Sequence, residues 1–309
     1  RDSTTMKNAA LAEAPDMPSE RTIPRSAHNR QELRSWRSCH DKLVTHARAY
    51  EPSDQRKLVL FGDSITESWR GTSYCRTIPR ARGIPAVLNS TLGVQWPGPI
   101  PLGVSADCTQ HLLWRLQQGE LTAAMTSDPR LTMVLLIGTN NLGHGQSVEE
   151  TTRGIVANAR FLLNSTRGNL LVNALLPRGD RRKRKHAQKL QHTATPSYGY
   201  KADILAVNTA LRATIDSHLA RAFPGRTEFV DCGAPFYSPS SVTNMAASIG
   251  LATTEAGGVG HAAIPPSQTN RPELVRRDLM PDRLHPNAAG HLLWGRCLSQ
   301  ALAHRGWAK

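Results

Sequence analysis

The chain has 309 residues, 39% of them hydrophobic, so it is long enough to bury a full core in one or two domains. No run of about 18 apolar residues occurs, and we therefore expect no membrane span. The formal net charge of +14 favours acidic partners such as a sulfated or uronate polysaccharide, nucleic acid or anionic lipid, and it carries no information about the fold.

The N-terminal part is polar. Residues 1–30 contain several Pro, Ser and Arg residues without apolar periodicity, which predicts an extended arm or a linker. The remainder, residues 31–309, is predicted to form a single domain that begins with a helix over 31–50. The chain starts with Arg rather than Met, so either a targeting segment has been removed or the sequence was trimmed for expression.

Five short apolar runs, rich in Leu and β-branched residues, are typical of strands buried on both faces. These runs are 57–61, 100–104, 131–137, 169–175 and 227–232. Helical patterns separate most of them, and one more follows the last: residues 107–119, 148–164, 201–222 and 288–303. Alternation of this kind predicts an α/β fold, with right-handed crossovers and a parallel sheet covered by helices on both sides.

Three segments look inserted between these elements. Residues 71–99 hold many Pro, Gly and Arg residues. Residues 233–280 form a loop that is long for a compact domain, which makes it a candidate wall or lid of a site. Residues 178–200 carry a basic run that is either a solvated loop or a docking surface for a polyanion: Arg181, Arg182, Lys183, Arg184 and Lys185.

The cysteines and the glycosylation sequons bear on the compartment. None of the cysteines is in a CxxC pair, so we expect no zinc site. Because the chain has five cysteines, at least one stays a thiol or forms an intermolecular bridge under oxidising conditions. Two N-glycosylation sequons begin at Asn89 and Asn164, and they favour the secretory pathway, with the cytoplasm as the alternative. The cysteines are Cys39, Cys75, Cys108, Cys232 and Cys297.

The first predicted strand leads into the sequence Gly62-Asp63-Ser64, and a helix is predicted to begin directly after it. Backbone N–H groups at a helix start are unpaired and favour negative charge. A serine hydroxyl there is either an ordinary helix N-cap or a nucleophile, and a nucleophile needs a base to remove its proton. Asp282 and His285 lie three residues apart before the last helix and could supply that base and its orienting carboxylate.

Residues 62–65 (GDSI) and 282–285 (DRLH) resemble the first and last blocks of the SGNH, or GDSL-type, hydrolases. Residues 103–116 resemble the second block and residues 138–141 (GTNN) the third. With residues 175–179 (LLPRG), the sequence is most similar to the catalytic α-subunits of platelet-activating factor acetylhydrolase and their relatives. The resemblance covers roughly residues 56 to 300, and the four blocks occur in the family's order at the ends of predicted strands.

This resemblance implies the SGNH hydrolase fold, a flavodoxin-like three-layer sandwich whose five-stranded parallel sheet has the order 2-1-3-4-5. In such sheets the ligand binds beyond the carboxyl ends of the strands. The resemblance also implies a carboxylic ester hydrolase that needs no metal or other cofactor and prefers a short acyl group, with acetyl as the first expectation.

The resemblance assigns a role to each block. Ser64 is the expected nucleophile, His285 the general base and Asp282 the carboxylate that orients it. The expected oxyanion donors are the N–H groups of Ser64 and Ala106 and the side chain of Asn140. The family usually has Gly where this chain has Ala106. That donor would fail if the backbone there required a positive φ, and Gly103 is then the fallback.

Other residues near these blocks have less specific interpretations. Arg178 either faces the site or braces loops, and Asn141 is a poorer donor than its neighbour. Cys108 is expected to be packed or bridged rather than nucleophilic. Four other histidines lack a comparable partner or fall inside a helix, and are expected to be ordinary polar or structural residues: His111, His144, His186 and His291.

The natural substrate stays open at this level. An O-acetylated glycan suits a basic, secreted esterase, and a phospholipid resembling platelet-activating factor is the alternative. A different class is a structural or binding subunit that uses the fold to dock a polyanionic partner. A homo-oligomer or a larger assembly is compatible with each of these.

Overall fold

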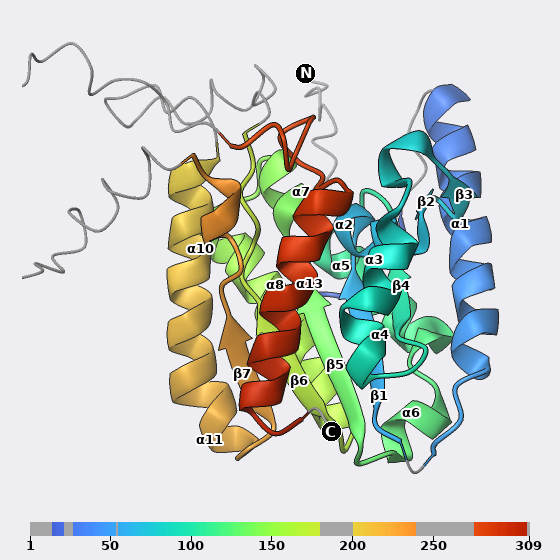
Figure 1. Cartoon of the computed structure of the whole chain (residues 1–309), viewed down its shortest axis with the longest axis vertical. Coiled ribbons are helices and arrows are strands. Elements are labelled where there is room, and N and C mark those ends of the chain that lie inside the picture. Colours follow the sequence, from blue (N-terminus) through green and yellow to red (C-terminus); the bar gives the residue numbers. More distant parts are fainter. Residues whose placement is uncertain (1–13, 22–26, 54, 180–199, 239–274, 308–309) are drawn as a thin grey trace, which may run out of the picture.

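The computed structural model describes residues 14–21, 27–53, 55–179, 200–238 and 275–307. Its main sheet has five parallel strands in the order β4-β1-β5-β6-β7 (Figure 1). The order 2-1-3-4-5 is confirmed, because β2 and β3 form a separate hairpin and do not count among the sheet strands. In sheet order, the strands are Ile100–Gly103, Lys57–Gly62, Leu131–Leu136, Asn169–Asn173 and Thr227–Val230.

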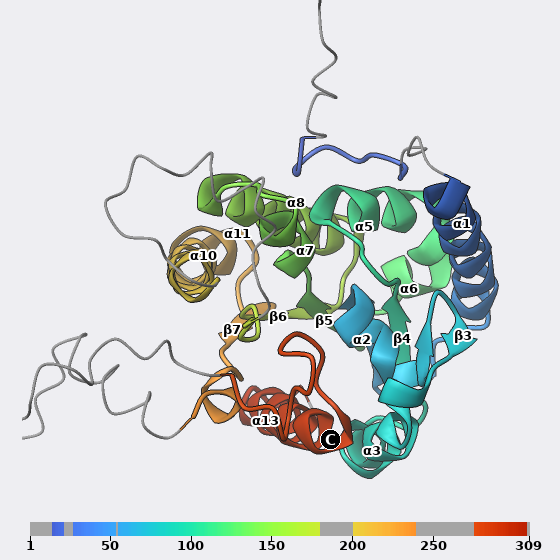
Figure 2. The same cartoon turned by 90° about the horizontal axis from the view of Figure 1, so that it is seen from above.

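Helices cover both faces of the sheet, which confirms the three-layer α/β arrangement (Figure 2). One face carries α5 (Thr109–Arg115), α8 (Val148–Ser165) and α10 (Lys201–Thr214). The other face carries α3 (Ile84–Ser90), α4 (Leu92–Gln95) and α13 (Ala288–His304). The long helix α1 (Ala27–Arg48) runs beside the β4 edge, and it begins before residue 31, where the sequence predicted its start.

The segment 71–99 is more regular than its composition indicated. It forms the hairpin of β2 (Thr72–Ser73) and β3 (Arg76–Thr77), followed by α3 and α4. The two short helices bury Ile84, Leu88 and Leu92, which recur every fourth residue. The many Pro and Gly residues obscured this helical period, so the sequence missed both helices.

Short helical segments complete the description. The α-helical ones are α2 (Ser64–Glu67), α6 (Ala123–Ser127), α7 (Thr139–Gly143) and α11 (Ala220–Ala222). The 3-10 turns are Ser68–Arg70, Pro79–Ala81 and Ala234–Phe236, and the π turns are Leu116–Glu120 and Ile215–Leu219. Among the described helices, none has the length and apolarity that a membrane crossing requires.

Two glycines let α2 lie directly on the ends of β1 and the edge strand β4. A Cβ on Gly62 would lie 2.2 Å from Thr66 Oγ1 and 2.3 Å from the Leu136 carbonyl oxygen. A Cβ on Gly103 would lie 2.5 Å from both the Asp63 carbonyl oxygen and the Glu67 nitrogen. Real Cβ atoms do not approach backbone this closely, so both positions require glycine. The close approach places the start of α2 at the carboxyl end of the sheet.

The structure pairs four of the cysteines. Disulfides join Cys39 to Cys75 and Cys232 to Cys297, while Cys108 is buried and takes part in neither. Both sequon asparagines are exposed, Asn89 on α3 and Asn164 near the end of α8. The basic run and His186 lie outside the described residues, as does most of the proposed lid, so those predictions remain predictions.

Candidate active site

Ser64 is the first residue of α2 and lies where β1 delivers the chain to the carboxyl edge of the sheet. Its neighbour Asp63 caps the helix by accepting a 2.9 Å hydrogen bond from the Ile65 N–H. The cap role therefore belongs to Asp63, which leaves the Ser64 hydroxyl available. That hydroxyl oxygen lies 2.9 Å from His285 Nε2.

His285 is held by Asp282 in the turn that precedes α13. Its Nδ1 lies 2.7 Å from Asp282 Oδ2, and an ionised carboxylate can only accept, so Nδ1 carries the hydrogen. Nε2 is then the basic nitrogen, and it faces Ser64. The other carboxylate oxygen, Oδ1, accepts the N–H groups of Leu284 at 3.0 Å and His285 at 2.7 Å.

The charge on Asp282 is well supported. Partial burial would raise the pKa of its carboxyl group, but the hydrogen bonds from His285 and Leu284, together with the nearby His285 charge, hold that pKa below its usual value. The turn itself is fixed by the Gly179 N–H, which donates a 2.8 Å hydrogen bond to the Arg283 carbonyl. The structure thus brings together all three predicted triad residues.

Ala106 lies in a tight turn directly after β4. The Asp107 N–H donates a 3.3 Å hydrogen bond to the Val104 carbonyl, and Ala106 has a φ of +63°. A position of this kind usually takes Gly or Asn, which explains why the family prefers Gly there. The positive φ that would have excluded Ala106 is present, and the alanine adopts it. In the described part of the chain its N–H makes no hydrogen bond, so it stays available as a donor.

Asn140 and Asn141 separate into two roles at the start of α7. The Asn140 Nδ2 donates a 2.9 Å hydrogen bond to the Asp107 carbonyl and lies 3.5 Å from Asp63 Oδ2. Asn141 is fully buried and accepts the Thr109 N–H at 3.0 Å, so it joins α7 to α5. The better candidate donor is therefore Asn140, as the third block predicted.

A buried ionic network lies beneath the turn of residues 104–107, which carries Ala106 and is called the oxyanion loop below, and the sequence did not reveal this network. Arg115 Nε donates to Asp107 Oδ2 at 2.7 Å, and the same guanidinium pairs with Glu120. Glu120 in turn lies 2.8 Å from His40 Nδ1, and Trp36 Nε1 donates to Asp107 Oδ1 at 2.6 Å. Because every charged oxygen has a partner, the network can remain buried and fix Asp107 next to Ala106.

Arg178 braces the third block. Its Nη1 donates a 2.7 Å hydrogen bond to the carbonyl of Thr139, the residue before Asn140, and its guanidinium lies over the Tyr200 ring. Burial raises the pKa of Asp63, and the positive charge of Arg178 opposes part of that rise. Of the two interpretations of Arg178, the contacts support the brace.

The structure corrects the expectation for His144 and refines that for Cys108. His144, at the end of α7, has its Nδ1 3.3 Å from Cys108 Sγ, so this histidine does have a partner. Cys108 is the N-cap residue of α5 and forms no disulfide. His111 Nδ1 accepts the Cys108 N–H at 3.1 Å and so has a capping role. His291 is buried against Trp69 and lies 3.3 Å from the Ile65 carbonyl, which fits a structural residue.

Known proteins resemble the chain in sequence and in fold. Bovine platelet-activating factor acetylhydrolase IB subunit alpha1 is 31% identical over 145 residues, which are 47% of this chain and 52% of that protein. The alpha2 subunit from Rattus norvegicus is 30% identical over 161 residues, 52% of this chain and 59% of that protein. The matched region thus spans about half the length of these relatives.

Solved structures share the fold at low sequence identity. A GDSL-like lipase from Bacteroides thetaiotaomicron superposes with a TM-score of 0.52 at 16% identity, covering 86% of this chain and 97% of that one. The sequence profile of the GDSL-like lipase/acylhydrolase family matches residues 60–293, which include the Ser64 turn and the Asp282–His285 turn. The chain therefore belongs to the GDSL-like lipase/acylhydrolase family.

Proposed function

We propose that the chain is a serine esterase that hydrolyses short-chain esters through a Ser64–His285–Asp282 triad. The observation that carries the proposal is the continuous hydrogen-bonded path from Ser64 Oγ through His285 to Asp282, over 2.9 and 2.7 Å. Family membership supports the same class of reaction.

In the acylation step, Ser64 Oγ attacks the ester carbonyl carbon while its proton moves to His285 Nε2. The carbonyl oxygen takes up the negative charge of the tetrahedral intermediate, next to the N–H groups of Ser64 and Ala106 and the side chain of Asn140. Asp282 stabilises the imidazolium that forms. Collapse breaks the bond to the alcohol, which leaves with the proton from His285.

Deacylation repeats these steps with water. His285 Nε2 takes a proton from the water molecule as its oxygen attacks the acyl carbon. The second tetrahedral intermediate releases the acid, and the proton returns to Ser64 Oγ. No group other than these side chains and backbone amides is required by the scheme.

For the substrate we favour an acetyl ester, on the strength of the relatives named platelet-activating factor acetylhydrolase. The net charge of +14 favours an acidic O-acetylated glycan as the carrier of that ester. A phospholipid of the platelet-activating factor type is the second candidate, supported by the same relatives. Comparing acetyl release from an O-acetylated uronate polysaccharide and from that lipid would decide between them.

We also infer a secretory location. Two disulfides persist in oxidising compartments, and both sequon asparagines are exposed enough to be glycosylated. The alternative is the cytoplasm. Treatment of the secreted protein with an N-glycosidase, followed by a mass measurement of the Asn89 and Asn164 peptides, tests the inference directly.

The central test is hydrolysis of p-nitrophenyl acetate by the wild type and by Ser64→Ala. The variant should lose activity and still fold, because the Asp63 cap and the packing of α2 do not use the hydroxyl. More than a few per cent of wild-type turnover in a folded Ser64→Ala protein would refute the nucleophile. Absence of turnover in the wild type would instead favour a binding or structural subunit.

A further inference from the structure

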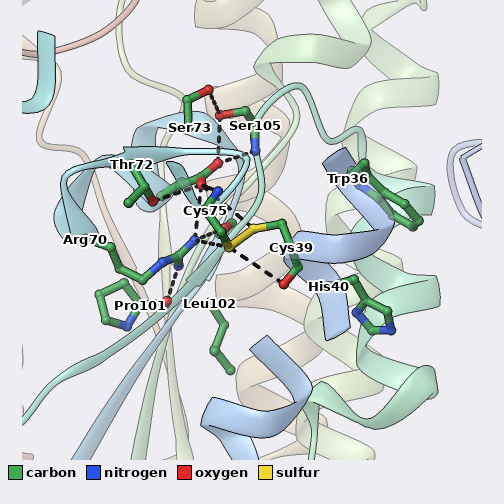
Figure 3. The surroundings of a disulfide bond; sticks show 12 residues. Trp36, Cys39, His40, Arg70, Thr72, Ser73, Cys75, Pro101, Leu102 and Ser105 are labelled. Atoms are coloured by element: carbon green, nitrogen blue, oxygen red, sulfur yellow. Dashed lines mark hydrogen bonds and ion pairs between the residues drawn. A yellow bond between two sulfur atoms is a disulfide. The ribbon is translucent and has the colours of Figure 1, made fainter. Parts of the chain in front are cut away.

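The Cys39–Cys75 disulfide joins α1 to the β2–β3 hairpin close behind the oxyanion loop. Cys39 is fully buried on α1, and Cys75 lies in the turn between β2 and β3. Figure 3 shows the hairpin residue Ser73 beside Ser105, with Cys75 and the disulfide below them. Ser105 is the residue before Ala106. The β2–β3 hairpin therefore links the disulfide to the residue next to a proposed oxyanion donor.

Glu67 connects the hairpin to the loop. Its side chain is fully buried at the last residue of α2, one turn after Ser64. Oε1 accepts the Cys75 N–H at 2.7 Å and the Thr72 hydroxyl at 3.0 Å. Oε2 accepts both the N–H and the hydroxyl of Ser105, each at 2.7 Å. One carboxylate oxygen thus holds the hairpin, and the other holds the oxyanion loop.

Arg70 balances the charge of this buried carboxylate. Its Nη2 lies 3.4 Å from Glu67 Oε1 and donates to the Gly103 carbonyl at 2.7 Å. Each carboxylate oxygen therefore has donors, as a buried charge requires. The pair also fixes the end of β4, where the oxyanion loop begins.

The same atoms could suggest a metal site, because the Cys39 and Cys75 sulfurs and a Glu67 oxygen lie within 4.8 Å of one another. The two sulfurs are bonded to each other, and the carboxylate is occupied by four hydrogen bonds. A guanidinium beside the carboxylate further disfavours a cation. The cluster is built to hold backbone rather than an ion.

The two backbone segments that Glu67 joins, the hairpin and the oxyanion loop, both contain left-handed residues that surrounding contacts must hold in place. Ala106 has a φ of +63°, and the hairpin residues Tyr74 and Cys75 have φ of +49° and +56°. Left-handed backbone costs a non-glycine residue about 1–2 kcal/mol. Conformations of this kind persist only where surrounding contacts enforce them.

We propose that Glu67 is a positioning residue that holds the Ala106 N–H in place as an oxyanion donor. The Cys39–Cys75 disulfide supports this role by fixing the β2–β3 hairpin, whose Thr72 and Cys75 donate to Glu67 Oε1. The proposal rests on the proposed esterase function. We call Glu67 and this disulfide together the brace. Loss of the brace lets the Ser105–Ala106 turn relax and moves the Ala106 N–H away from the oxyanion. The triad itself is untouched, since none of its hydrogen bonds involves the brace.

The two disulfides provide a matched comparison. Cys39→Ala/Cys75→Ala removes the brace disulfide, and Cys232→Ala/Cys297→Ala removes one that joins the end of β7 to α13. Measured on p-nitrophenyl acetate well below both melting temperatures, kcat of the first variant should be about 10-fold or more below that of the second. KM and the pH profile of kcat should match between them, because substrate binding and His285 are unchanged.

A second series tests Glu67 directly. Glu67→Gln keeps the size but turns one acceptor oxygen into an NH2 donor, so it cannot hold both Cys75 and Ser105. Its kcat should fall at least about 10-fold, with an unchanged pH profile. Ser105→Ala keeps the hydrogen bond from its backbone N–H to Glu67, so its kcat should fall less than that of Glu67→Gln. If Glu67→Gln does not fold, the disulfide comparison alone decides.

Equal kcat for the two disulfide variants, or wild-type kcat in Glu67→Gln, would overturn the brace. Failure of the esterase proposal looks different, because either the wild type would then show no turnover or Ser64→Ala would retain the activity of the wild type. An inactive Ser64→Ala together with equal disulfide variants refutes the brace alone.

Discussion

The side-chain amide of Asn140 donates a 2.9 Å hydrogen bond to the backbone carbonyl of Asp107. This bond joins the third sequence block to the second, across the carboxyl ends of β5 and β4. Asp107 is in turn fixed by Trp36 and Arg115, so the Asn140 side chain rests on a rigid buried network. An amide carries two N–H groups: one donates to Asp107, and the other makes only a long 3.5 Å contact with Asp63 Oδ2, which an oxyanion can replace.

Asn140→Ala should therefore lower kcat about 100-fold with little change in KM, because this donor acts on charge that develops in the transition state. Steady-state kinetics on p-nitrophenyl acetate measure both constants. A raised KM at unchanged kcat would place Asn140 in ground-state binding instead.

Asp282→Asn should impair hydrolysis less than His285→Ala. His285 carries the proton in both steps, whereas Asp282 orients the ring and stabilises its charge without itself taking the proton. The Asp282 side chain is half exposed, so the substitution should leave the fold intact. Values of kcat/KM for both variants test the order, and a greater loss in Asp282→Asn would contradict it.

Asp63 should make the protein less stable as the pH rises. Burial raises the pKa of its carboxyl group from 3.8 to about 7, helped by the nearby charge of Asp107. Between these values the folded protein holds a proton that the unfolded chain has released. The free energy of unfolding contributed by Asp63 is fully present below pH 3.8 and is lost toward pH 7, by about 1.4 kcal/mol per pH unit.

Asp63→Asn isolates this effect, because Asn still accepts the Ile65 N–H but has no charge to bury. Urea unfolding of both proteins at pH 5 and pH 7.5 gives the free energy difference between them. That difference should move in favour of the variant at the higher pH. An identical difference at both pH values would show that Asp63 is ionised throughout.

The basic run should attach the protein to a polyanion in a salt-sensitive way. Replacing its five cations by Ser should lower the salt concentration that elutes the protein from heparin, because added salt shortens a Debye length of about 10 Å at 0.1 M. Hydrolysis of the neutral p-nitrophenyl acetate should be nearly unchanged. The replaced residues are Arg181, Arg182, Lys183, Arg184 and Lys185.

A control variant removes the same number of cations from scattered exposed positions on the helices and their ends. If it elutes like the run variant, net charge governs retention and the run has no special role. If neither variant changes elution, the attraction lies elsewhere. The control replaces Lys42, Arg48, Arg160, Arg167 and Arg221 by Ser.

The sequence alone predicted the strands and the candidate triad, and the resemblance to the SGNH hydrolases supplied the order of the strands. A strand buried on both faces is a nearly continuous apolar run, so short apolar stretches of the sequence were enough to predict β5 and the neighbouring strands. The close packing of Gly62 and Gly103 likewise leaves a local signature, because no other residue fits. Ser64, Asp282, His285 and Asn140 occupy short blocks whose spacing reflects the turns that carry them.

Only the tertiary structure decided the partners across the chain. Glu67 meets Ser105, His40 meets Glu120 beneath the loop, and Cys39 meets Cys75, through contacts that join separate elements of the fold. Sequence spacing constrains hydrogen bonds within a turn, but it does not say which buried charge will find which partner. The backbone of Ala106 belongs to the same class, since its positive φ depends on the turn that surrounding residues enforce.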